Sequence, residues 1–160
     1  MLEAKSPRYT FYVGMLTLTA LAAWTGTFFM LGPQRITSLW LTNAFAVALL
    51  LRIPRRMWPA TIAVIGALVA AIWVASTGLS LRPIGLTLAT CVDITLATLL
   101  MSAPRIAAME RGSPPYIGNF ILRAGMLAPL GSLPIALLVV AGHGGSLVDN
   151  AQDWLVAHSL

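Results

Sequence analysis

One carboxylate stands in the middle of a long apolar stretch of this sequence. Asp93 is the only charged residue between Ile84 and Met101. A charged side chain at the centre of a bilayer costs about 2.5–3.5 kcal/mol on translocon-derived scales, so such residues face protein rather than lipid. Ala89 and Ala97 share its helical face. The pattern predicts either a buried carboxyl that hydrogen-bonds a neighbouring helix, or a site that responds to a ligand or a proton.

Three further polar or amphipathic residues lie inside apolar segments. Arg123 stands one turn into a segment that starts at Phe120. It is expected either to reach the headgroups or to pair with Asp93, which would lie about 8 Å deeper. Trp40 is typical of an interface anchor, whereas the amide of Asn43 needs a partner helix or a cavity. We treat these four residues as candidate ligand-binding or signalling residues.

The polar segment 142–153 and the stretch that follows it hold another group of candidates. They comprise both histidines and two of the acids: His143, Asp149, Asp153 and His158. Such residue types bind divalent metals, but their spacing matches no metal motif. A polar loop in which Asp149 or Asn150 caps a following helix is an equally good interpretation. We expect no metal here and keep all four as signalling candidates.

Motifs for catalysis and cofactor binding are missing from the sequence. There is no glycine-rich phosphate loop and no HExxH, and the segment around Ser146 is not a GxSxG nucleophile motif. Mg²⁺-dependent transferases need clustered acids, whereas Asp93 stands alone. We therefore expect these residues to hold no cofactor and to perform no catalysis.

Composition indicates the elements that position these residues. Of 160 residues, 58% are hydrophobic and 9% charged, whereas soluble domains are about 45–50% apolar and about 25% charged. The mean hydropathy is +0.85. Such values exclude an ordinary soluble domain and a disordered chain, and a single cysteine excludes a disulfide framework. The chain is predicted to be a multi-pass membrane protein.

We predict an all-α transmembrane bundle with five spans and the start of a sixth, because a span needs about 20 apolar residues. The predicted spans are 12–31, 37–51, 58–76, 84–101 and 120–141, with a sixth from residue 154. Residues 1–22 also resemble a cleavable signal, but the first apolar run reaches full bilayer length and favours a retained span. The segment 102–119 is expected to be a loop, and the fifth span to be broken at Pro129, Gly131 and Pro134.

Small residues recur at every fourth position of the third span. They are Ala63, Ala67, Ala71 and Ala75. Such a stripe lets helices approach closely in lipid. It predicts a packing seam within the bundle.

The basic residues predict the orientation in the membrane. The chain has ten Lys and Arg against five Asp and Glu, a net charge of +5. All the basic residues but Arg35 and Arg82 lie in or beside connections on one side of the predicted membrane. The positive-inside rule places that side, and the N-terminus, in the cytoplasm. The surplus is therefore expected to set orientation rather than to bind nucleic acid.

The second and third spans carry a recognisable pattern. Residues 38–52 read SLWLTNAFAVALLLR, and residues 54–59 read PRRMWP. This resembles the bacterial MASE-type membrane sensor domain, the first family of that name. Trp40, Asn43, Trp58 and Pro59 match its pattern, but Leu41 stands where a proline is usual.

Two further positions extend the resemblance toward the end of the chain. Asp93 lies where that family tends to carry an acid, usually glutamate. Residues 154–160, WLVAHSL, resemble its tryptophan-led penultimate stretch, in which an acid is commoner than His158.

The resemblance implies a sensory module of the bacterial inner membrane. In that family the module precedes a cytoplasmic output, often a GGDEF or EAL domain of cyclic-di-GMP turnover, or a histidine kinase. We expect residues 1–160 to be one transmembrane sensor domain, without a soluble domain, that continues beyond Leu160. Its expected partners are the bilayer, an output domain in cis, an unidentified small ligand and a second copy of the chain. A small-molecule transporter or permease subunit and a plain membrane anchor remain alternatives.

Overall fold

A computed structural model describes residues 7–31, 39–79, 81–110, 112–141 and 148. Every element in this part of the chain is a helix, as the sequence predicts. The elements are α1 (Pro7–Leu31), α2 (Leu39–Leu50), η1 (Arg55–Met57), α3 (Trp58–Thr77), α4 (Leu81–Met101), α5 (Pro104–Ala107), α6 (Pro114–Leu122), η2 (Arg123–Leu127) and α7 (Ala128–Ala141).

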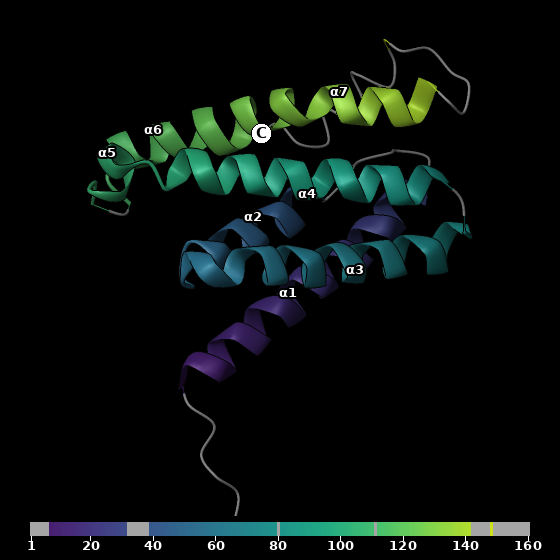
Figure 1. The fold of residues 1–160 in the computed structure, drawn as a ribbon, viewed down its shortest axis with the longest axis horizontal. Coiled ribbons are helices and arrows are strands. Elements are labelled where there is room, and N and C mark those ends of the chain that lie inside the picture. Colours follow the sequence, from purple (N-terminus) through teal and green to yellow (C-terminus); the bar gives the residue numbers. More distant parts are fainter. Residues whose placement is uncertain (1–6, 32–38, 80, 111, 142–147, 149–160) are drawn as a thin grey trace, which may run out of the picture.

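The long helices lie side by side, with α4 in the middle (Figure 1). α4 packs against α3 on one side and against η2 and α7 on the other. α2 packs against α1 and also reaches α4, and α1 crosses obliquely beside α3. α2 and α4 both run toward the end of the bundle at which α5 lies.

Three helical segments among the described residues are long and apolar enough to cross a membrane. They are Arg55–Ser76, Ile84–Met101 and Pro114–Leu138, and α2 contributes only the shorter apolar stretch Leu41–Leu50. Multi-pass membrane insertion is therefore supported by length and composition. The start of the predicted sixth span lies outside the described residues.

Proline and glycine mark the ends of several helices. Pro59, Pro104 and Pro114 stand in the first turns of α3, α5 and α6, where the missing N–H would have no helical partner. Gly78 follows α3 with φ +84° and donates its N–H to the carbonyl of Val74. Glycine reaches that conformation without the steric cost of a Cβ.

The fifth predicted span differs from the expectation in two ways. The helix begins at Pro114 rather than at Phe120, so the predicted loop 102–119 holds α5 and most of α6. The helix is also unbroken, because α6, η2 and α7 follow one another directly and Pro134 lies inside α7. The irregularity is instead a π-helical turn, in which the Ala128 N–H donates to the carbonyl of Arg123. A wider turn there fits the following Pro129, which lacks an N–H and crowds the carbonyl four residues back.

The core lies where α1, α2, α3 and α4 meet. Its most enclosed apolar side chains include Ala46, Leu50, Ile65, Val69 and Ile94. The predicted alanine seam is wrong: all four alanines of that stripe are exposed on α3. A different small residue makes the close contact, since a Cβ on Gly66 would lie 2.8 Å from Cys91 Sγ of α4.

Candidate functional site

A polar pair lies inside the bundle between α2 and α4. The amide nitrogen of Asn43 donates a hydrogen bond to Asp93 Oδ2 at 2.5 Å. The exposed fraction is 5% for Asn43 and 2% for Asp93. The neighbours that share the face of Asp93, Ala89 and Ala97, are buried as predicted. Both residues were candidates from the sequence, and the structure brings them together.

Three buried side-chain oxygen atoms of α2 and α4 have no hydrogen-bond partner among the described residues. They are Asn43 Oδ1, Asp93 Oδ1 and the hydroxyl of Thr42, all buried. Buried polar atoms in folded proteins nearly always have a partner, and an unpaired one costs about 1–3 kcal/mol. The site therefore has capacity for a proton or for a group that donates hydrogen bonds.

Thr90 and Thr98 of α4 do not supply those missing bonds. Thr90 donates to the carbonyl of Leu86 at 3.0 Å, and Thr98 to that of Ile94 at 2.7 Å. These are bonds to the preceding helical turn, which satisfy a threonine locally. Asp93 differs from them because it reaches across to another helix.

The alternative in which Arg123 pairs with Asp93 is wrong. Its Nε donates to Asn119 Oδ1 at 3.1 Å, and a guanidinium nitrogen donates to the carbonyl of Leu100 at 3.4 Å. Leu100 is one residue from the end of α4, about 10 Å along the helix from Asp93. The side chain of Arg123 thus reaches toward the end of α4. We call this end, which also carries Arg52, Arg55, Arg56 and Arg105, the basic end of the bundle. This is the direction expected if Arg123 reaches toward the headgroups.

The basic end of the bundle is held together by two side chains. The indole N–H of Trp58 donates to the carbonyl of Leu50 at 2.8 Å, so α3 caps the last turn of α2. Arg55 donates to the carbonyl and the hydroxyl of Ser102, at 3.4 and 3.3 Å, and lies over the Trp58 ring. The α2–α3 connection is thereby joined to the end of α4.

Sequence reasoning missed two members of these sites. Thr42 carries one of the unpaired oxygens, and its place beside Asn43 was the available signal. Ser102 begins the connection after α4, as predicted, but its contact with Arg55 was not foreseen. Equal depth was the signal for the Asn43–Asp93 pair, since Asn43 is nine residues before Arg52 and Asp93 eight before Met101.

The remaining candidates receive no new role from the structure. Trp40 lies in the first turn of α2, and its side chain is outside the described atoms. The four polar candidates near the end of the chain, His143, Asp149, Asp153 and His158, lie outside the described residues. Within the described part of the chain, no three His, Cys, Asp or Glu residues form a group that can hold a metal ion.

Comparison with known proteins adds no relative. No family model matches the chain, and neither a curated protein nor a solved structure matches it.

Proposed function

We propose that this chain is a membrane-embedded signal-input module of a bacterial inner membrane. In this proposal it has five spans and part of a sixth, with the N-terminus in the cytoplasm. It regulates a cytoplasmic output domain of cyclic-di-GMP turnover or a histidine kinase in cis. The resemblance of residues 38–59 to MASE-type sensor domains supports this function, as does the basic end of the bundle.

The observation that carries the proposal is the incomplete Asn43–Asp93 pair. A polar contact that only holds two helices together is expected to satisfy its own oxygens. Here an oxygen of each partner is buried and has no partner among the described residues, and the same holds for the hydroxyl of the preceding residue, Thr42. Such a site gains binding free energy when a proton or a donor group fills it.

A change at the pair has a short route to the basic end of the bundle. Asn43 and Leu50 belong to the same 12-residue helix, α2. Leu50 accepts the indole hydrogen bond of Trp58, at the start of α3. A shift of α2 against α4 therefore changes the connection that carries Arg52, Arg55 and Arg56, the side predicted to face the cytoplasm.

The test replaces Asp93 by asparagine in the gene at its native locus. We expect Asp93→Asn to leave the amount of protein in the membrane nearly unchanged. We expect the output activity of the variant to differ from that of the wild type. The readouts are the cellular cyclic-di-GMP concentration and the phosphorylation of a cognate kinase. Glu110→Gln is the matched control, because it makes the same kind of change at an exposed carboxylate. Unaltered output in Asp93→Asn at normal abundance would contradict the proposal and leave a plain anchor.

A transporter is the alternative from another class. In this alternative Asp93, Asn43 and a fifth span broken by proline and glycine line a substrate path, as discontinuous helices do in many transporters. The helix is continuous from Pro114 to Ala141, so the broken span no longer supports a transporter. The transporter alternative would be supported if proteoliposomes that contain the protein took up labelled small molecules and those with Asp93→Asn did not.

A further inference from the structure

Two neighbouring cavities open at the basic end of the bundle. The larger, of about 340 Å³, lies between α2 and α6. Its walls are mostly apolar, and Arg52 is the charged residue among those that line it. The lining is formed by Ala44, Val47, Ala48, Leu51, Arg52, Gly112, Tyr116, Ile117 and Phe120. Its volume falls within the range of about 300–1,000 Å³ that is typical of ligand pockets.

The smaller cavity, of about 240 Å³, adjoins the first and is more polar. The two share Leu51 and Tyr116 as lining residues. Arg55, Trp58 and Ser102 also line the smaller one. An apolar groove thus lies next to a smaller cavity whose lining residues include an arginine, a serine and a tyrosine.

Neighbouring contacts hold the two arginines at the cavities in place. Arg55 lies 5.6 Å from the centroid of the Trp58 ring and donates to Ser102. Arg52 lies 6.0 Å from the centroid of the Phe11 ring. Within the described part of the chain, neither guanidinium has a carboxylate partner. Guanidinium groups bind phosphate with paired N–H donors, and their charge is uncompensated here.

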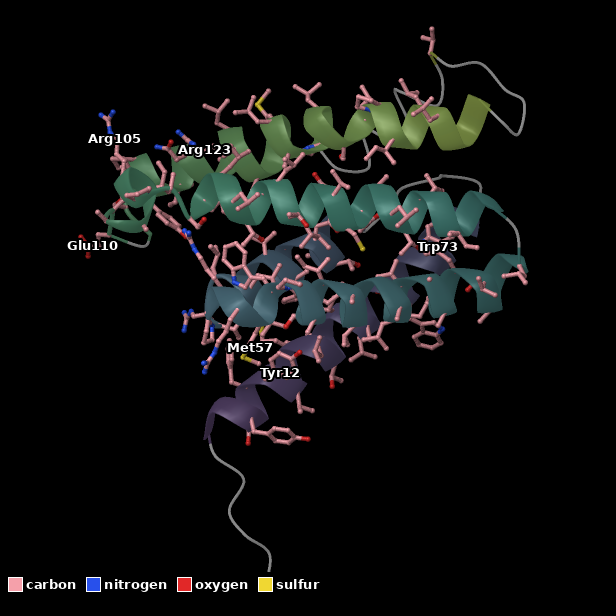
Figure 2. The ribbon with its side chains drawn as sticks, in the orientation of Figure 1. Tyr12, Met57, Trp73, Arg105, Glu110 and Arg123 are labelled. Atoms are coloured by element: carbon pink, nitrogen blue, oxygen red, sulfur yellow. The ribbon has the colours of Figure 1, made fainter. Side chains whose placement is uncertain are left out.

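The charge of this end is strongly positive. The described side chains there include Arg52, Arg55, Arg56, Arg105 and Arg123. Glu110 is the single described acid in that region, and Figure 2 shows it pointing outward at the tip of the molecule. The mouth of the groove is therefore complementary to an anion.

We propose that this groove binds an anionic glycerophospholipid. An acyl chain lies between α2 and α6 along Ala48 and Ile117, and the phosphate meets Arg52 and Arg55. The groove lies within apolar helices, and its charged mouth lies at their end. An apolar groove that ends beside arginines fits a lipid with an apolar tail and an anionic headgroup. The lipid would belong to the leaflet at the basic end of the bundle. This site is separate from the Asn43–Asp93 pair and does not depend on the proposed signalling function.

Native mass spectrometry of the detergent-purified chain tests the proposal. The probes are phosphatidylglycerol and phosphatidylcholine with identical acyl chains, added in equal amounts. We expect preferential retention of phosphatidylglycerol, and a loss of about fivefold for each arginine removed in Arg52→Gln and Arg55→Gln. Arg105→Gln is the matched control, because it removes an exposed charge at the same end that does not line either cavity.

A second pair of variants tests the groove without changing charge. Ala48→Trp fills the groove, whereas Ala67→Trp adds the same bulk on the exposed face of α3. We expect only the former to lower phosphatidylglycerol retention. Equal retention of the two lipids, an equal loss in Arg105→Gln, or full retention in Ala48→Trp would each overturn the proposal. A dimer that Ala48→Trp dissociates would place a second copy in the groove and overturn it as well.

Discussion

Gly66 is a residue at which α3 lies close to α4. The neighbouring turn of α4 presents Cys91, and a Cβ on Gly66 would lie 2.8 Å from its sulfur. Close approach of this kind matters in a membrane, where packing rather than hydrophobic burial holds helices together. The absence of a side chain at Gly66 therefore leaves room for Cys91 of α4, the helix that carries Asp93.

We expect Gly66→Ala to destabilise the protein by about 1 kcal/mol, because overpacking outweighs the better helix propensity of alanine. The measurement is thermal unfolding in one detergent. Gly14→Ala serves as the control for propensity alone, since nothing lies within 4 Å of a Cβ there. Adding Cys91→Ala to Gly66→Ala is expected to restore most of the loss. Additive effects of the two changes would show that the side chains do not meet.

At this scale the sequence predicts which residues are unusual but not which of them meet. Asp93 and Asn43 stand out because lipid penalises both. Their pairing depends on the lateral placement of α2 against α4, which depth alone does not determine. The alanine stripe fails for the same reason, because spacing defines a face of α3 but not the neighbour of that face.

Among the elements, α2 depends most on its surroundings. Its 12 residues are too few to cross a bilayer of about 30 Å as a straight helix. Its last turn ends at Leu50, whose carbonyl accepts the Trp58 indole N–H. The sequence pattern marks Trp58 through its resemblance to a known family, and the structure assigns it this capping contact.

Trp58→Phe removes the donor and keeps an aromatic ring beneath Arg55. We expect a loss of about 1 kcal/mol in unfolding free energy, the usual net value of one hydrogen bond. Hydrogen exchange is expected to speed up in the last turn of α2 and to stay unchanged in the middle of α4. An equal increase in both helices would contradict a local capping role.

Helix existence is predicted better than helix bounds. α3 starts at Trp58 and α4 ends at Met101, as expected, because charges and prolines mark those ends. Pro129 and Pro134 mislead in the last helix. In lipid a helix continues through prolines, because neighbouring groups and wider turns satisfy the freed carbonyls.

At the scale of the whole molecule, the positive charge gathers where the α2–α3 connection contacts the end of α4. The α2–α3 turn and the end of α4 are joined through Arg55 and Ser102. Figure 2 shows Arg105 and Arg123 at the same end as Met57, and Trp73 toward the other end. One end of the bundle therefore collects most of the described arginines, whereas Arg82 stands in the first turn of α4 at the other end. The positive-inside rule predicts that the basic end lies on the cytoplasmic side of the membrane.

Site-specific labelling in a Cys91→Ala background tests that orientation. The background leaves no other thiol, because Cys91 is the single cysteine. Leu79→Cys places a thiol at an 81% exposed position at the far end of α3. Arg56→Cys places one at the basic end. We expect a membrane-impermeant maleimide to label Leu79→Cys in intact cells and Arg56→Cys only after permeabilisation. The reverse pattern would invert the topology, placing the phospholipid groove in the outer leaflet and the Arg55–Ser102 contact away from any cytoplasmic output.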